Sequence, residues 1–389
     1  MDFPCVRACN ATVLALPASG LPTAARRWQD AARGPSIATP RLASSLGNVA
    51  MPNRAQQIFN QPEFKLGLGG VPLGNEFARH SDADAAATLE AAWAVGVRYF
   101  DVAPWYGFGL AERRFGHFLH RQRREDYVLS SKVGKLFKAS RGNRHAEIFP
   151  FSDSPNDLVI DYTADGVRRS VEDSLQRMGV SHLDIAFVHD LSPDFAWFPD
   201  GWEEQYEIAR KGAFPALSKM RDEGLIRAWG VGVNTPFAIR QVIADADPDV
   251  CLCARQYSLI DHAHTLHELM PAVRAKDVSL VMGSSLNAGF ISGSPRFNYG
   301  RDNFRIPPEV IARRDKLRAV AARHGVDLRT AALQFSAAAP ESVALVVGAR
   351  SAAQIQEDWN ALRAHIPSAF WQELKSERLV EQDAPTPGA

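Results

Sequence analysis

The chain has 389 residues, with 44 basic and 44 acidic side chains, so its formal net charge is zero. This balance argues against nucleic acid or an anionic membrane surface as the main partner. No apolar stretch is long enough to cross a bilayer, and the length allows one large barrel or two ordinary domains. The composition therefore favours a cytoplasmic globular protein, whose oligomeric state the sequence does not indicate.

Residues 1–60 differ from the rest of the chain, being rich in Ala, Pro, Ser and Arg without sustained periodicity. Such a segment buries too little apolar surface to fold alone. We expect a disordered N-terminal extension, followed by one domain over residues 61–389. Met51 is a candidate for the physiological first residue, and peptides from residues 1–50 in the native protein would contradict that start.

From Phe64 onward, short apolar runs alternate with segments of helical pattern. The sequence predicts eight strands, over 65–70, 98–101, 127–132, 183–189, 226–233, 250–256, 278–283 and 342–347. It predicts helices over 81–95, 110–120, 163–178, 206–223, 262–275, 309–324, 328–338 and 367–380, with others opening near residues 236 and 351. This alternation with short connections favours parallel strands and right-handed crossovers. We therefore expect an α/β fold, a single (β/α)8 TIM barrel.

Three successive predicted strands, the second to the fourth, end on ionisable residues: Asp101, Lys132 and His189. Tyr106 follows the first of these in a tight turn rich in proline and glycine. A polar residue at a strand end can simply mark where the strand meets water. A barrel, however, gathers the carboxyl ends of its strands at one face. We therefore expect these four side chains to form one site.

The four residue types suit acid–base chemistry on a hydroxyl or carbonyl group. A phenol with an ordinary pKa near ~10 exchanges its proton too rarely at neutral pH unless a cation stabilises the phenolate. Lys132 would supply that cation to Tyr106, and Asp101 would hold and orient the lysine. His189 would orient the substrate oxygen through a hydrogen bond.

The motifs around these residues resemble those of a known family. Asp-Val-Ala-Pro-Trp-Tyr-Gly (101–107), Ser-Ser-Lys-Val-Gly (130–134) and Val-His-Asp (188–190) look like the tetrad motifs of the aldo-keto reductases. The resemblance covers roughly residues 64–380. It implies a (β/α)8 barrel that uses a nicotinamide cofactor without a Rossmann domain, with hydride transfer beside the proton transfer.

The same resemblance implies cofactor contacts on the later strand ends. Asn234 and Gln256 would hydrogen-bond the nicotinamide carboxamide, and Tyr257 would stack on the nicotinamide ring unless it packs in the core. The other expected cofactor contacts are Ser284, Leu286 and Gly289 at the pyrophosphate, and Gly348, Arg350, Gln354 and Asp358 on the adenosine side, near a helix N-terminus.

The turn after the last strand indicates which nucleotide binds. Members of the family that prefer NADP usually place a lysine and an arginine there to hold the 2'-phosphate. This chain has Gly348, Ala349 and Gln354 in that turn, with Arg350 as a single phosphate partner. One arginine supplies less charge than a pair, so NAD is the expected cofactor and NADP the alternative.

Two further segments, 67–75 and 346–358, look like the branch of the family that contains aldose 1-dehydrogenases, L-fucose dehydrogenases and pyridoxal 4-dehydrogenases. That branch implies oxidation of a sugar at C1 to a lactone, or of a related alcohol, with Tyr106 as the base. Trp105 would pack on the ring of this small-molecule substrate. Asp190 would hydrogen-bond sugar hydroxyls unless it is a solvated loop acid. The alternatives are an NADPH-dependent aldehyde or ketone reductase and a non-catalytic cofactor-binding subunit.

Three long connections, 133–160, 190–205 and 290–308, are expected to carry substrate specificity. The second of them holds four aromatic residues: Phe195, Trp197, Phe198 and Trp202. These would either wall the pocket or pack over the helix beneath them.

No metal site is expected. His264 and His267 would share one face of a helix, but no strong third ligand is placed beside them. Cys251 and Cys253 point to one face of a predicted strand and are expected to be buried reduced thiols.

Overall fold

The computed structural model describes residues 51–141, 148–198, 201–298 and 305–388. The described residues belong to one compact unit, Met51–Ala389. The predicted disorder of residues 1–50 lies outside the described part of the chain. That expectation and the start at Met51 stay predictions.

Eight strands form the closed barrel: β1 Leu66–Gly69, β2 Tyr99–Asp101, β3 Val128–Val133, β6 Leu183–His189, β7 Ile226–Val233, β8 Val250–Ala254, β9 Ser279–Gly283 and β10 Ser342–Gly348. Their order around the barrel is β1-β10-β9-β8-β7-β6-β3-β2, and all eight pairings are parallel. The predicted (β/α)8 TIM barrel is confirmed, with a strand at each of the eight predicted places.

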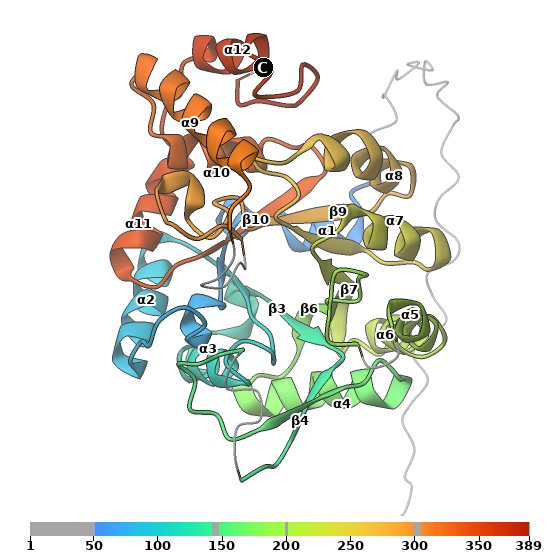
Figure 1. The fold of residues 1–389 in the computed structure, drawn as a ribbon. Coiled ribbons are helices and arrows are strands. Elements are labelled where there is room, and N and C mark those ends of the chain that lie inside the picture. The colour runs from blue at the N-terminus through green and yellow to red at the C-terminus, as the bar shows by residue number, and fades with distance from the viewer. Residues whose placement is uncertain (1–50, 142–147, 199–200, 299–304, 389) are drawn as a thin grey trace, which may run out of the picture. The chain divides into compact units, whose positions relative to one another are not determined.

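Helices surround these strands (Figure 1). They are α1 Arg54–Ile58, α2 Asp82–Val95, α3 Leu110–Leu119, α4 Ala164–Met178, α5 Trp202–Lys211, α6 Ala213–Asp222, α7 Pro236–Asp245, α8 Met270–Ala275, α9 Pro308–Arg323, α10 Leu328–Ala337, α11 Ala352–Ala361 and α12 Ser368–Ser376. The helix expected over 206–223 is really two, α5 and α6, which meet at Gly212. The helix expected over 262–275 starts with a π-helical turn, Thr265–Leu269, ahead of α8.

Local sequence signals explain where several helices begin and end. Ser81 caps α2 in a reciprocal capping box with Asp84, and Gly96 ends the helix with a left-handed φ of 105°. Thr163 and Ser351 cap α4 and α11 by accepting a backbone N–H with their hydroxyl groups. These caps fix the entry of the chain into helices that directly precede or follow barrel strands.

The connection 133–160 is more structured than expected. It contains a two-stranded antiparallel sheet made of β4 Lys135–Lys138 and β5 Asp157–Ile160. The sheet leaves the barrel directly after β3 and lies alongside α4 (Figure 1). The sequence analysis predicted a long connection here and did not predict this small sheet.

The first residues of this compact unit are also ordered. The extension was expected to reach residue 60, whereas Arg54–Ile58 forms α1, capped by Asn53. Ala55, Ile58 and Phe59 are buried in one cluster with strand residues such as Tyr99. The folded part thus includes residues 51–60, because these apolar side chains cover one end of the barrel interior.

The expectation for the two central cysteines is confirmed. Cys251 and Cys253 are free, buried thiols in β8. Burial raises the pKa of each thiol to about 12, so neither is a thiolate at neutral pH. In the described ranges, no helix has the length and apolar character that a membrane span requires.

Candidate active site

The three ionisable strand ends lie on neighbouring strands. Asp101 is the last residue of β2, Lys132 lies one residue from the end of β3, and His189 is the last residue of β6. The strands β2, β3 and β6 are adjacent and parallel. Their carboxyl ends therefore meet at one face of the barrel, as the sequence predicted.

Asp101 and Lys132 form a buried ion pair. The ammonium Nζ of Lys132 donates to Oδ2 of Asp101 at 2.7 Å and to the carbonyl of Val102 at 3.1 Å. The hydroxyl of Ser130 donates to the other carboxylate oxygen at 2.6 Å. Both charged side chains are almost fully buried. Because every oxygen of the carboxylate has a donor, the pair can be kept ionised in a place where charges are costly.

The turn that carries Tyr106 is fixed by a close backbone approach. A Cβ atom on Gly107, which has a φ of 64°, would lie 2.3 Å from the carbonyl oxygen of Gly74. A Cβ on Gly74 would lie 2.7 Å from the carbonyl carbon of Tyr106. The hydroxyl of Ser152 also donates to the carbonyl of Gly107 at 2.8 Å. Only glycine at both positions allows this packing, which holds the phenol beside the barrel.

Tyr106 lies against both Lys132 and His189. The ammonium of Lys132 is 4.7 Å from the centre of the Tyr106 ring. The ring of His189 meets that of Tyr106 edge to face, with centroids 5.7 Å apart. The structure therefore brings the four predicted catalytic residues together in one place.

His189 is held as a neutral ring. Burial lowers its pKa well below the ordinary value, and the charges of Lys135 and Lys132 lower it further. Its backbone carbonyl accepts a hydrogen bond from the hydroxyl of Tyr162 at 2.6 Å. Its buried Nδ1 has no hydrogen-bond partner among the described residues. A neutral, fixed imidazole can accept or donate one hydrogen bond to a substrate oxygen without changing its charge.

Most predicted cofactor residues lie at the same ends of later strands. Asn234 follows β7 directly, Gln256 lies two residues beyond β8, and Gly348 ends β10. In the turn after β10, the backbone N–H of Arg350 donates to the side-chain oxygen of Gln354 at 2.9 Å. This hydrogen bond holds the turn in place without a bound ligand.

The loop after β9 has an unusual backbone. Four of its residues have a left-handed φ: Ser284, Asn287, Ala288 and Gly289. The buried Oγ of Ser285 and Oδ1 of Asn287 have no hydrogen-bond partner among the described residues. Leu286, also a predicted contact, packs partly buried against the core. Strained backbone and unpartnered buried polar atoms at strand ends are typical of ligand sites.

The prediction for Tyr257 does not agree with the structure. Its ring is only 1% exposed and stacks on Phe335 of α10, with centroids 5.0 Å apart. A ring buried in this way has no free face for a nicotinamide. The alternative of core packing is the one that the structure supports, because the chain turns outward after β8 and carries the ring under α10.

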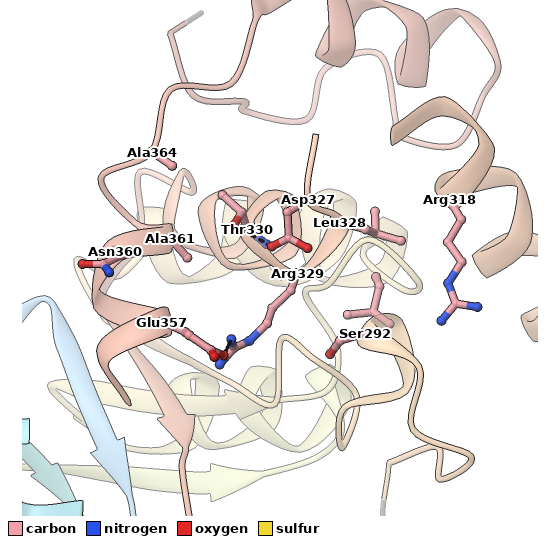
Figure 2. Close-up of a pocket in the computed structure, with 11 residues that line it drawn as sticks. Ser292, Arg318, Asp327, Leu328, Arg329, Thr330, Glu357, Asn360, Ala361 and Ala364 are labelled. Atoms are coloured by element: carbon pink, nitrogen blue, oxygen red, sulfur yellow. Dashed lines mark hydrogen bonds and ion pairs between the residues drawn. The ribbon is translucent and has the colours of Figure 1, made fainter. Parts of the chain in front are cut away.

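A cavity of about 640 Å³ lies beside the β9 loop, between α10 and α11. Its lining includes Ile291, Ser292, Arg318, Leu328, Arg329 and Glu357. In Figure 2 the side chain of Arg329 reaches toward Glu357, while Arg318 lies on the opposite side of the cavity. The lining mixes apolar and polar groups, and none of the predicted adenosine contacts Gly348, Arg350, Gln354 and Asp358 belongs to it.

Asp358 does not face this cavity as a free acceptor. It is buried, and its Oδ1 accepts from Arg329 at 2.6 Å. Arg329 also donates to the carbonyl of Gln354 at 3.2 Å. Burial raises the pKa of Asp358 to about 7, and the guanidinium opposes that rise. In this structure Asp358 holds Arg329 through Oδ1, whereas its buried Oδ2 has no hydrogen-bond partner among the described residues, and its contact with a cofactor stays a prediction.

Asp190 lies beside His189, and it shares with Trp105 a partner that the sequence analysis missed. Lys135, the first residue of β4, forms an ion pair with Asp190, and its ammonium lies 4.1 Å from the centre of the Trp105 ring. Asp190 is thus not a solvated loop acid. Lys135 was missed because alternation along β3 would point it away from Lys132, but Gly134 breaks that alternation with a φ of 94°.

The aromatic residues of the connection 190–205 divide into two groups. Phe195 and Trp197 meet Trp105 edge to face at 6.0 and 6.4 Å, beside the site. Trp202 belongs to α5 and packs against Tyr206 and Phe237. The first pair walls the candidate site, whereas Trp202 packs away from it.

The histidines considered as metal ligands do not act together. His264 hydrogen-bonds Glu268 at 2.9 Å, while His267 lies beside Glu381 and Asp383. The second group is exposed, and exposed acidic groups commonly lie together without an ion.

Comparisons with known proteins agree with this geometry. Residues 65–378 match the model of the aldo/keto reductase family. The chain belongs to the aldo/keto reductase family. It is accordingly an NAD(P)-dependent oxidoreductase of small carbonyl or alcohol compounds, and the tetrad motifs were correctly recognised as those of this family.

This aldo/keto reductase is 36% identical over 330 residues to pyridoxal 4-dehydrogenase of Microbacterium luteolum, covering 81% of this chain and 94% of that protein. It is 33% identical over 327 residues to D-threo-aldose 1-dehydrogenase of a Pseudomonas species, covering 83% and 95%. An aldo-keto reductase structure from Bacillus halodurans matches with a TM-score of 0.62 at 22% identity, covering 82% and 94%. The structural match is evidence of a shared fold alone.

Proposed function

We propose that this protein is an NAD-dependent aldose dehydrogenase, which oxidises C1 of a cyclic sugar to a lactone. The observation that carries the proposal is the buried ion pair of Lys132 and Asp101, whose ammonium lies 4.7 Å from the centre of the Tyr106 ring. A bound nicotinamide would accept the hydride that leaves C1. The chain's own residues would handle the proton and the substrate oxygen.

Tyr106 is the base in this reaction. It takes the proton of the C1 hydroxyl as the carbon–oxygen double bond of the lactone forms. The ammonium of Lys132, 4.7 Å from the ring centre, stabilises the negative charge on the phenol oxygen. Asp101 keeps that ammonium in place, and neutral His189 hydrogen-bonds the reacting oxygen. General base catalysis of this kind is worth about 10²- to 10⁴-fold in rate.

The choice of an aldose rests on the polar edge of the site and on one relative. Asp190 provides a carboxylate next to His189, which suits a ring with several hydroxyl groups. The relative from Pseudomonas is named as an aldose 1-dehydrogenase. Pyridoxal is the second candidate substrate, because the relative from Microbacterium is named as a pyridoxal dehydrogenase and has slightly higher identity.

An oxidation screen tests this proposal. L-fucose, D-arabinose, L-galactose, L-glucose and pyridoxal would each be offered with NAD and with NADP, following reduction of the cofactor by absorbance. We expect oxidation of at least one aldose. Activity with pyridoxal alone would favour the second candidate, and activity only as NADPH-dependent reduction of aldehydes would overturn the proposed direction.

The preference for NAD is argued from charge near the predicted adenosine site. Gly348 and Gln354 replace cationic residues, and Arg329 is already paired with Glu357 and Asp358. Arg350 and Arg318 remain near the site, so weak NADP binding is expected as well. Titration by protein fluorescence should give about tenfold tighter binding of NAD. Tighter binding of NADP would contradict the preference without affecting the catalytic residues.

A further inference from the structure

Lys135 is a second lysine at the candidate site, outside the tetrad. It follows the kink at Gly134, where a Cβ would lie 2.1 Å from the Tyr162 ring. Tyr162 in turn donates its hydroxyl proton to the carbonyl of His189. The kink, Tyr162 and the end of β6 are therefore one packed unit, and Lys135 is held in a fixed place relative to His189.

The ammonium of Lys135 is enclosed on several sides. The side chain is 1% exposed, and Nζ lies 4.1 Å from the Trp105 ring centre and 4.2 Å from that of Phe195. Its carboxylate partner is Oδ2 of Asp190. Burial lowers the pKa of Lys135, and Asp190 opposes this effect. A buried lysine is costly unless it is paired, so the ion pair with Asp190 holds the two side chains together beside the site.

Asp190 is the more accessible member of the pair. Its side chain is 17% exposed, and its Oδ2 lies 3.6 Å from Nε2 of His189. The backbone of Asp190 is left-handed, with a φ of 52°, and its N–H donates to the carbonyl of Gly232 at 3.0 Å. This conformation directs the carboxylate toward Lys135 and His189. A strained aspartate at a strand end is typical of a functional position.

The two oxygens of this carboxylate have different surroundings. Oδ2 accepts a hydrogen bond from the ammonium of Lys135, whereas Oδ1 has no hydrogen-bond partner among the described residues. An ionised carboxylate can accept several hydrogen bonds, so Oδ1 is available to a hydroxyl group of a ligand. Because His189 would bind the reacting oxygen, a hydroxyl on the neighbouring carbon would come next to Asp190.

We propose that Lys135 is a positioning residue for substrate recognition, which fixes the carboxylate of Asp190 to accept a hydrogen bond from the hydroxyl beside the reacting carbon. The inference rests on the proposed oxidation at this site and names its substrate class more closely: ring compounds with vicinal hydroxyl groups. Trp105, whose ring lies against the ammonium of Lys135, completes the edge of the site. Lys135 acts through Asp190 and does not itself contact the substrate.

The test compares a substrate with its deoxy analogue. Lys135→Met keeps a side chain of similar length between the two aromatic rings but removes the charge. We expect kcat/KM for the accepted sugar to fall by about 10- to 100-fold, mostly through KM, because a hydrogen bond to a charged group is lost. For the analogue that lacks the neighbouring hydroxyl, kcat/KM should change by less than about threefold, since this compound never makes that hydrogen bond.

Three further variants make the result specific. Asp190→Asn should show the same substrate-selective loss, and it serves if Lys135→Met does not fold. Lys135→Arg should restore part of the sugar activity, because it keeps the cation. Lys138→Met, on an exposed residue of the same strand, should leave both substrates unaffected.

An equal loss for the sugar and its analogue in both Lys135→Met and Asp190→Asn would overturn the proposal, as would no loss in either. Binding of NAD, followed by fluorescence, should stay unchanged in every variant. If the wild type oxidises no sugar but accepts another hydroxylated compound, the proposed function fails. Comparing the loss of kcat/KM for that compound with the loss for its deoxy analogue then still decides the role of Lys135.

Discussion

At the scale of single residues, the buried charge of Lys132 depends on one counter-charge. Asp101 accepts from Lys132 and from Ser130 and is nearly fully buried. Asp101→Asn keeps the shape but leaves the ammonium without a compensating charge. We expect it to lower the free energy of unfolding by about 3–5 kcal/mol, measured by denaturant titration.

The double variant Asp101→Asn with Lys132→Met provides the control for this prediction. It removes the uncompensated charge and should be more stable than Asp101→Asn alone. A double variant that is less stable than the single one would show that desolvated charge is not the reason for the loss.

The lowered pKa of another buried residue, His262, leads to a prediction of how the free energy of unfolding depends on pH. Burial lowers its pKa to about 4, with Nδ1 bonded to the Ser258 carbonyl at 2.9 Å and Nε2 accepting from the Glu381 N–H at 3.2 Å. An unfolded histidine titrates near ~6.5. Between pH about 6.5 and 4 the unfolded chain therefore binds a proton that the folded chain does not. Stability should fall as pH falls through this window, by up to about 1.4 kcal/mol per pH unit.

Denaturant titrations at several pH values would check this. His262→Gln should show a smaller loss of unfolding free energy between neutral pH and pH about 5 than the wild type. His117→Gln, on an exposed position of α3, should keep the slope of the wild type. Equal slopes in all three proteins would contradict the assignment to His262.

Some site residues could be predicted from the sequence and others could not. Asp101, Lys132 and His189 end apolar runs, and parallel strands bring such ends to one face. Lys135 could not be placed, because the kink at Gly134 depends on packing against Tyr162, which is distant in sequence. Tyr257 was misassigned because the path of the chain after β8 is set by contact with α10.

At the scale of elements, the junction between β3 and β4 is decided by one glycine. Gly134 combines a φ of 94° with a Cβ position 2.1 Å from the Tyr162 ring. Gly134→Ala should therefore cost about 2–4 kcal/mol of unfolding free energy, from backbone strain and displacement of Tyr162. Gly325→Ala is the matched control, with a φ of 61° and no heavy atom within 4 Å of the added Cβ.

The control should lose only about 1–2 kcal/mol, the cost of the left-handed backbone alone. The difference between the two losses of unfolding free energy measures the cost of the steric overlap with Tyr162. If both variants lose the same amount, the overlap with Tyr162 does not limit position 134.

At the scale of the whole molecule, α1 and Phe59 cover one end of the barrel interior and shield its apolar side chains from water. Phe59 is 1% exposed and meets Tyr99 edge to face at 4.9 Å. Phe59→Ala should lower the free energy of unfolding by about 3–5 kcal/mol. Phe237→Ala, at a residue that is 54% exposed, should change it by less than about 0.5 kcal/mol. Similar small losses in both variants would show that the cover is not needed.

The barrel itself was predictable from the sequence, because eight apolar runs alternate with capped helical segments. The cover and the sheet of β4 and β5 were not, since both are short and lie outside that rhythm. Their stability comes from tertiary contacts, such as those of Ile58 and Phe59 with the strand residues, rather than from local pattern.

The central claim is that the phenol of Tyr106, beside Lys132 and His189, moves the proton in an oxidoreductase reaction. Tyr106→Phe removes only the hydroxyl group, so it tests this claim most directly. We expect turnover, followed by cofactor absorbance, to fall by at least about 10²-fold, while NAD binding by fluorescence changes by less than about twofold. Turnover close to that of the wild type in this variant would contradict the account.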